Sequence, residues 1–330
     1  MTIGPLGIGG VIDRAIAAAR LDFRPLFVAM LLLQAPALAL ARLVSAQTPS
    51  FLLDSTDPRL AAERAPATLA AAGALFVVLF LLQSVATTVA AAILAPALAP
   101  DLGEAVEAAG PGAGWGRRLL AAAGTGLVQQ LLMVVAIGLG MVPGLLLVFT
   151  ARSAATALAG AAGAVLGGLV LFLVVLLRTI LAPVAVAVEG LGPWGALRRS
   201  VRLMAPRPGQ PPLERPGVRA SLLLFTTFAL MLAVNGLAGL PRAVAGGLAG
   251  GGPLPFMPGT LPLPVELGLS LFELVAGAAL QPFSLAVTVV FYFERRARTE
   301  GLDLAAWAAR LEAAQRGLVP DALASPETAR

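Results

Sequence analysis

Long apolar runs separated by short charged segments dominate the pattern of this 330-residue chain. The longest run extends from Leu158 to Val188 and carries one charge, that of Arg178. An apolar run longer than about 18 residues is typical of a helix that spans a membrane. The pattern therefore predicts six spanning helices, at roughly residues 25–41, 69–94, 119–150, 158–188, 220–240 and 265–293.

The first run has an alternative interpretation as a cleaved signal peptide, because Val44-Ser45-Ala46 resembles a small-residue cleavage site. The segment that precedes this run is longer and more amphipathic than the start of a typical signal peptide. We therefore favour a retained first span.

Amphipathic segments accompany the apolar runs. Apolar side chains recur at helical spacing in residues 5–22, and again after Asp303, which fits a helix N-cap. Pro183 can break the fourth run and let residues 194–203 lie along the membrane interface. The sequence thus predicts an all-α integral membrane protein with three parts: an N-terminal interfacial helix (1–24), a six-span membrane domain (25–293), and a cytoplasmic C-terminal amphipathic helix and tail (294–330).

The arginines give the expected orientation. All 23 basic residues are Arg, and with six spans 17 of them fall on the side of both termini and 5 on the opposite side. Cytoplasmic loops of membrane proteins carry such a basic excess, which predicts cytoplasmic N and C termini. Because these residues sit at the ends of apolar runs rather than on one soluble face, they do not indicate nucleic-acid binding.

The amino-acid composition limits the kinds of catalysis and metal binding that the chain can support. Charged residues make up 12% of the chain, against about 25% in a typical soluble domain. The chain has no Cys, His or Lys, so thiolate and imidazole metal ligands, the commonest general base and Schiff-base chemistry are absent. We expect no catalytic residues, metal or cofactor, and an enzyme is the less favoured interpretation.

Arg178 is the one charge in the fourth run. An ionisable residue inside a membrane is a candidate functional group. However, 20 residues separate it from Leu158, which is about 30 Å of helix, so it should reach the cytoplasmic boundary and anchor the span there.

The sixth run carries a polar stripe. Glu266, Ser270, Glu273, Gly277, Gln281, Ser284 and Thr288 follow a spacing of three and four residues, which is one face of a helix. Near the midplane this stripe is joined by amides of other spans: Gln83, Gln129 and Gln130. The stripe has two interpretations, hydrogen bonding that packs helices together or the lining of a path for a cargo, and we favour packing. Gly163-x-x-x-Gly167 also indicates close helix packing.

Three separated segments carry a family resemblance: Gly9–Ala15 with Phe23–Leu26, a central one from Arg178 to Leu203, and one from Tyr292 to Leu304. They are similar to the membrane-domain family of bacterial glycerophosphoryl diester phosphodiesterases and its stand-alone relatives of unknown function. The resemblance implies the fold and a multi-pass topology in a bacterial inner membrane. It does not imply hydrolysis, because the catalytic barrel of those enzymes needs His and this chain has none.

The matched segments would form a collar at the inner leaflet. Its expected lipid-headgroup contacts are Arg178, Trp194, Arg198, Arg199, Arg202, Arg295, Arg296 and Arg298. Alternatively, these arginines are on this side only because cytoplasmic segments of membrane proteins are rich in basic residues, which requires no specific binding of lipid. Glu189, Glu300 and Asp303 are expected to pair with the collar and hold its two segments together.

These observations predict a non-enzymatic inner-membrane protein that associates with lipid or organises the membrane at the cytoplasmic leaflet. The alternative is a transporter or permease component with a polar path lined by the sixth span. Membrane lipids, anionic ones among them, are the expected partners, and the sequence leaves a second copy or another membrane protein open.

The orientation is directly testable. A reporter fused to either terminus should read cytoplasmic, because 17 of the arginines lie on that side. Paired reporters that are active in the cytoplasm and in the opposite compartment give the measurement. A terminus that reads outside would overturn the prediction that both termini are cytoplasmic.

Overall fold

The computed structural model of the protein describes residues 7–47, 58–98, 114–207, 209–248 and 261–301. Within these ranges every regular element is a helix, which confirms the expected all-α class. The elements are α1 (Ile8–Leu21), α2 (Phe23–Gln47), α3 (Pro58–Leu98), α4 (Trp115–Thr150), α5 (Ala154–Thr179), α6 (Ala182–Glu189), α7 (Pro193–Leu203), the 3-10 helix η2 (Pro212–Glu214), α8 (Pro216–Leu248) and α9 (Leu263–Glu300).

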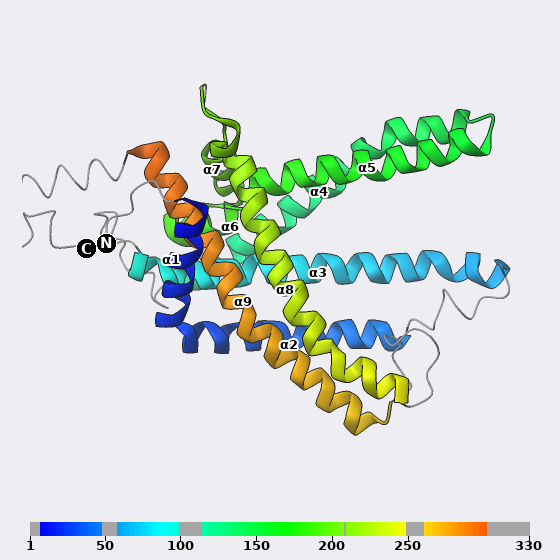
Figure 1. Ribbon diagram of the computed structural model, residues 1–330, viewed down its shortest axis with the longest axis horizontal. Helices are drawn as coiled ribbons and strands as arrows, with labels where there is room; N and C mark the ends of the chain where they lie inside the picture. Colours follow the sequence, from blue (N-terminus) through cyan, green and yellow to red (C-terminus); the bar gives the residue numbers. More distant parts are fainter. Residues whose placement is uncertain (1–6, 48–57, 99–113, 208, 249–260, 302–330) are drawn as a thin grey trace, which may run out of the picture.

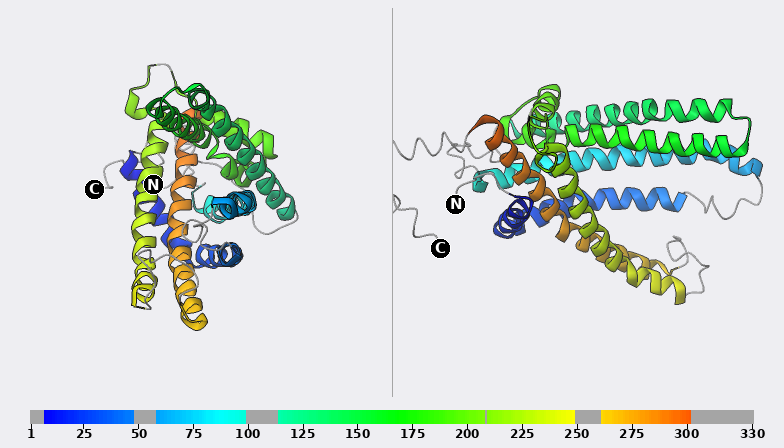
Figure 2. Two further views of the ribbon diagram at one scale, coloured as in Figure 1. Left: turned by 90° about the vertical axis from the view of Figure 1, so that its right-hand side faces the viewer. Right: turned by 45° about the horizontal axis from the view of Figure 1, so that its top comes forward.

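The short helices α1, α6 and α7 gather at one end of the molecule with the last turns of α9 (Figure 1). We call this region the packed end. The long helices α2, α3, α4, α5, α8 and α9 extend from it, and α1 lies beside α9 (Figure 1). Away from the packed end, the α4–α5 pair diverges from the α8–α9 pair (Figures 1 and 2).

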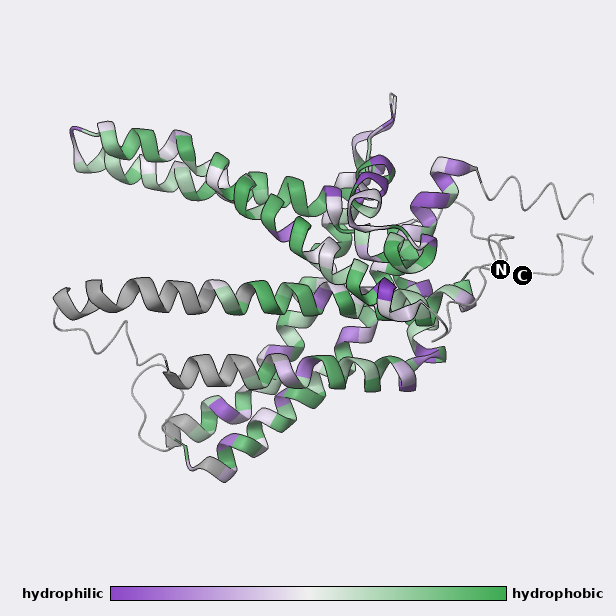
Figure 3. Ribbon diagram, turned by 180° about the vertical axis from the view of Figure 1, so that it is seen from behind, coloured by the Kyte–Doolittle hydropathy of each residue, from purple (hydrophilic) through white to green (hydrophobic). Residues whose placement is uncertain are grey.

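Five of the long helices have the length and hydropathy of a membrane span: α3, α4, α5 continued by α6, α8 and α9. Hydrophobic residues cover much of their length (Figure 3), and many large apolar side chains on α4, α5 and α8 are exposed. Such surface is stable against lipid and unstable against water, so the fold is that of an integral membrane protein. In α2 the apolar stretch Phe23–Pro36 is shorter than a span, so the count of six remains a prediction.

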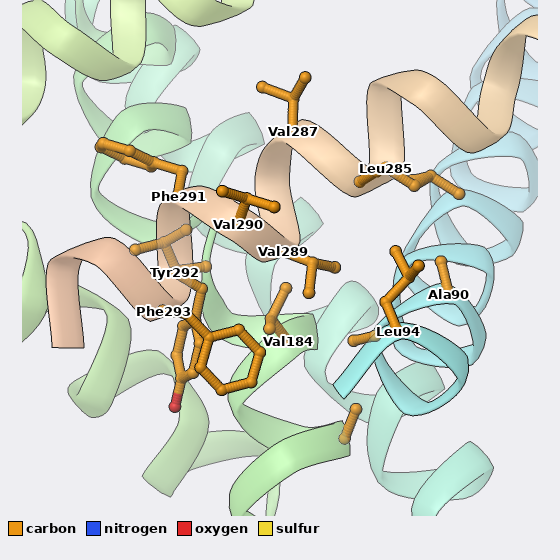
Figure 4. Packing of buried hydrophobic residues seen from close by; sticks show 14 of the residues in the cluster. Ala90, Leu94, Val184, Leu285, Val287, Val289, Val290, Phe291, Tyr292 and Phe293 are labelled. Carbon is orange, nitrogen blue, oxygen red and sulfur yellow. The ribbon is translucent and has the colours of Figure 1, made fainter. Parts of the chain in front are cut away.

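The apolar core lies in the packed end. Side chains of α9 from Val289 to Phe293 pack beside Val184 of α6 and Leu94 of α3 (Figure 4). All six residues from Ala182 to Ala187 are buried, so α6 is enclosed on every side. The helix begins with Pro at its first turn and ends at Gly190, whose φ of 65° favours glycine. The break expected at Pro183 therefore separates α6 from α5 and buries it in the centre of the packed end.

The N-terminal amphipathic segment forms α1, but its apolar stripe meets protein. Val11, Ala15, Ala18 and Ala19 are buried, and α1 packs mainly against α9. The face that we expected to lie in the membrane interface is therefore covered by another helix. The expected C-terminal amphipathic helix and Asp303 lie outside the described residues.

Glycines bring α4 and α5 into backbone contact. A Cβ added at Gly140 would overlap the backbone of Gly167, and one added at Gly144 would overlap that of Ala164. Among the described elements this is the most extensive helix pair. The expected close packing around Gly167 is thus present, and its partners come from α4.

The α4–α5 contact predicts a difference between two matched substitutions. Gly144→Ala should destabilise the protein by about 1–3 kcal/mol, because the added methyl forces the two backbones apart. Gly138→Ala, on the same helix with no atom within 4 Å of its added Cβ, should be neutral or stabilise by up to about 1 kcal/mol. Thermal unfolding in detergent would measure both; equal losses would contradict the packing.

Candidate functional site

The exposed face of α7 carries an aromatic ring beside two arginines. Trp194, Arg198 and Arg202 are exposed, whereas the opposite face of the helix is buried in the packed end. The guanidinium of Arg198 lies 5.4 Å from the centre of the Trp194 ring, within the range of a cation–π contact. Trp and Arg on one face of an amphipathic helix are typical of an element at a membrane interface.

Ser200 fixes α7 against the break between α5 and α6. Its buried hydroxyl donates to the carbonyl of Arg178 at 2.8 Å and accepts from the N–H of Leu181 at 3.2 Å. Helix ends leave such backbone groups without partners inside the helix. The Arg178 side chain is exposed in the last turn of α5, at the junction with α7.

A charge cluster joins α6, α7 and α9, and we call it the Glu189 cluster. The carboxylate of Glu189 accepts from Arg199 Nε at 2.8 Å and from the hydroxyl of Tyr292, and it lies 3.7 Å from Arg296 Nε. Glu300 pairs with Arg199 and, at 3.0 Å, with Arg296. Two cations and two anions thus balance in this network, and the structure contains the expected pairing of Glu189 and Glu300 with the two collar segments.

The electrostatics of Arg199 follow from this cluster. Burial alone would lower the pKa of its guanidinium, but hydrogen bonds and charge from Glu189 and Glu300 outweigh that effect and raise the pKa. Arg199 is therefore a permanent cation that is held by protein carboxylates.

A second charged group is buried where α8 begins. Glu294 is fully buried and accepts from Arg219 Nη1 at 2.8 Å, and it also pairs with Arg298 one turn further along α9. Arg295 is 1% exposed and donates through Nε and Nη2 to the carbonyl of Leu203, at 3.1 and 2.9 Å. This contact ties the end of α7 to α9.

The eight residues that were expected to contact lipid headgroups therefore fall into three groups: exposed, paired with glutamates, and buried in the interior. Arg178, Trp194, Arg198 and Arg202 are exposed, whereas Arg199, Arg296 and Arg298 are held by glutamates. Arg295 lies in the interior, so the expectation that it faces headgroups from the surface is wrong in this structure. The physical reason is that the last turns of α9 are covered by α7 and α8, and do not form a free cytoplasmic extension.

The far end of the polar stripe binds an arginine. Arg242 of α8 donates to Glu273 at 2.7 Å, to Glu266 at 2.5 Å and to the hydroxyl of Ser270 at 3.0 Å. These groups hold α8 and α9 together at the end opposite the packed end. Glu273 is thus part of an interhelical ion pair.

The middle of the stripe contacts two other helices. Gln281 accepts from the amide of Gln34 in α2 at 2.9 Å and donates to Gln83 in α3 at 2.6 Å. An alanine in place of Gly277, one turn away, would crowd the Gln34 amide. These contacts favour the packing interpretation of this part of the stripe.

The other stripe residues lie apart. Gln129 and Gln130 are buried in α4, and the side-chain amide of Gln130 has no hydrogen-bond partner among the described residues. Ser284 lines a small pocket between α8 and α9. The structure therefore does not join all members of the stripe into one surface.

In the described part of the chain, no group of three or more Cys, His, Asp or Glu side chains is placed to hold a metal ion. The arrangement consists of ion pairs, amide contacts and an exposed aromatic–arginine face. Such groups bind anions and pack helices.

Fold and hydropathy together define an all-α integral membrane protein. No protein-family model, curated protein or solved structure matches the chain. The likeness to the membrane domain of glycerophosphoryl diester phosphodiesterases therefore remains a hypothesis from short motifs.

Sequence reasoning missed three partners that complete these contacts: Arg219, Arg242 and Gln34. Arg242 and Gln34 could have been suspected, because each is a polar group next to or within an apolar run. Nothing in the sequence distinguishes Arg219 from the other arginines at the ends of the apolar runs.

The Glu189 cluster predicts a large effect from a small change. Glu189→Gln should destabilise the protein by about 2 kcal/mol or more, because the half-buried Arg199 and Arg296 lose the carboxylate that they share. Glu214→Gln, at an exposed acid of η2, is the matched control and should change stability by less than about 0.5 kcal/mol. Chemical denaturation in mild detergent measures both; equal midpoints would refute the structural role of the cluster.

Proposed function

We propose that this protein binds anionic phospholipids at its packed end and organises lipid at the cytoplasmic leaflet of a bacterial inner membrane, with both termini on that side, without catalysing a reaction. The observation that carries the proposal is the exposed face of α7, where Trp194 stacks beside Arg198 and where Arg202 is also exposed.

The physical basis is that α7 is rigidly held while its polar face is left open. Ser200 and the Glu189 cluster fix the helix from its buried side. A tryptophan ring is stable at headgroup level, and each exposed arginine near an anionic surface contributes about 1 kcal/mol. The side chain of Arg178, exposed at the junction with α7, adds a further cation to this surface.

The contacts of the polar stripe weigh against the transporter alternative. Its glutamates are engaged by Arg242 and its central amide by Gln34 and Gln83. A path for a cargo would need such groups to face an open passage. Flux of a solute in proteoliposomes would favour that alternative.

The test is retention of lipid by the purified protein. Arg198→Gln combined with Arg202→Gln should lower the enrichment of phosphatidylglycerol over phosphatidylcholine by about tenfold or more, because two exposed cations are lost. Native mass spectrometry after extraction from mixed-lipid membranes gives the ratio. Arg152→Gln, which removes an exposed arginine in the turn between α4 and α5, should leave it unchanged. Equal enrichment in the double variant and the wild type would reject the proposal.

A further inference from the structure

One face of α8 is left uncovered by the described part of the chain. The residues of this face follow one another at intervals of three and four, so they form one stripe along the helix: Phe225, Phe228, Leu232, Asn235 and Gly239. The three large apolar side chains among them are 71%, 65% and 63% exposed, and Asn235 is also exposed. Within the described residues α8 packs mainly against α9, and this stripe, which we call the α8 stripe, has no covering helix.

The α8 stripe has the spacing of a surface that packs against another helix. Side chains that alternate by three and four residues face the partner helix in coiled coils and in most bundles of spanning helices. Because α8 has the length and hydropathy of a span, its exposed phenylalanines contact acyl chains unless another helix covers them. Apolar side chains are stable in either surrounding, so the polar member of the stripe decides between the two.

Asn235 is a polar group on this apolar face and has no hydrogen-bond partner among the described residues. It lies within the 22 residues between Arg219 and Arg242, none of which is charged. The two other exposed polar side chains of this run, Ser221 and Thr226, donate to carbonyls of their own helix, each at 2.9 Å. Asn235 therefore presents an amide whose hydrogen bonds acyl chains cannot supply.

Two glycines beside Asn235 are not needed for packing among the described residues. A Cβ added at Gly236 or Gly239 would meet no atom within 4 Å outside the local helix backbone. In contrast, the positions that a Cβ would take at Gly140 and Gly144 of α4 are filled by the backbone of α5. Glycine is less favourable than alanine inside a helix, but on the surface of a spanning helix it lets a second helix approach closely. Both glycines thus fit a contact with a helix outside the described chain.

We propose that the α8 stripe is a dimer interface, which binds the same stripe of a second copy of this chain. Copies that are inserted in one membrane share one orientation, so their α8 helices are parallel and a two-fold axis places each Asn235 opposite the other. A side-chain amide both donates and accepts, so the two amides satisfy each other, and an identical helix supplies the required partner. A single asparagine in such a stripe also fixes the register of the two helices. This interface does not depend on lipid binding at α7.

Cysteine cross-linking of the full chain in membranes tests the interface, and the chain has no cysteine of its own. Leu232→Cys, in the α8 stripe, should give a disulfide-linked dimer on oxidation. Leu237→Cys is the matched control, because Leu237 is 65% exposed on the same helix but lies on another side of it. This control should give about a tenth as much dimer or less. Both variants keep Asn235, so neither removes the contact that is tested.

Asn235→Leu tests the pair of amides. Energy transfer between labelled copies of the full chain, measured as lipid or detergent dilutes them, gives the Kd of the dimer. This variant should raise the Kd about tenfold, because the hydrogen bonds between the two amides are lost. Its Tm as a monomer should not fall, because the amide has no hydrogen bond to a described residue. Thr226→Val is the control and should leave the Kd unchanged, because that hydroxyl bonds within its own helix.

Three results would overturn the proposal. A chain that stays monomeric at every dilution and does not cross-link would mean that water or lipid headgroups satisfy Asn235. Equal cross-linking of Leu232→Cys and Leu237→Cys, or a Kd that Asn235→Leu leaves unchanged, would mean that the copies associate through another face. A product of Leu232→Cys whose mass contains a different protein would mean that the partner is not a second copy.

Discussion

The structure depends on how the charged end of α9 is buried. Apolar residues from Val289 to Phe293 enter the core, and the next turn places Glu294 and Arg295 in the interior as well. Buried charges are stable only with partners, so other elements must supply them. Arg219 of α8 pairs with Glu294, and the Leu203 carbonyl of α7 accepts from Arg295. Glu189 of α6 lies near the neighbouring Arg296, and together these contacts fix the elements of the packed end relative to one another.

That constraint explains why some arginines of the packed end are paired inside the protein and others are exposed. Those on the last turns of α9, together with Arg199, are held by carboxylates or carbonyls, so they contribute to folding and cannot also attract lipid freely. The arginines on the outer face of α7, Arg198 and Arg202, are exposed on the same face as Trp194. A rigid buried side and an open basic side on one short helix form a suitable surface for headgroups.

Further along the long helices the same principle applies. Arg242 is shared by Glu266 and Glu273, and Gln281 by Gln34 and Gln83, so polar side chains on these helices pair with one another. The helices α4 and α5 are held together differently: at Gly140 and Gly144 the backbone of α4 comes into direct contact with the backbone of α5. Gln130 is the exception: its buried amide has no partner among the described residues.

The sequence by itself determined the class of protein, the approximate helices and the break at Pro183, because each follows from apolar run length or from proline stereochemistry, which are local properties. It also placed Glu189, Arg199 and Glu300 in neighbouring segments. It did not reveal that Arg295 is buried, that α1 covers α9, or that Arg219 and Arg242 complete ion pairs. Those facts depend on which helix faces meet across long stretches of chain, and a pattern of apolar and charged positions is the same whether a face meets lipid, water or another helix.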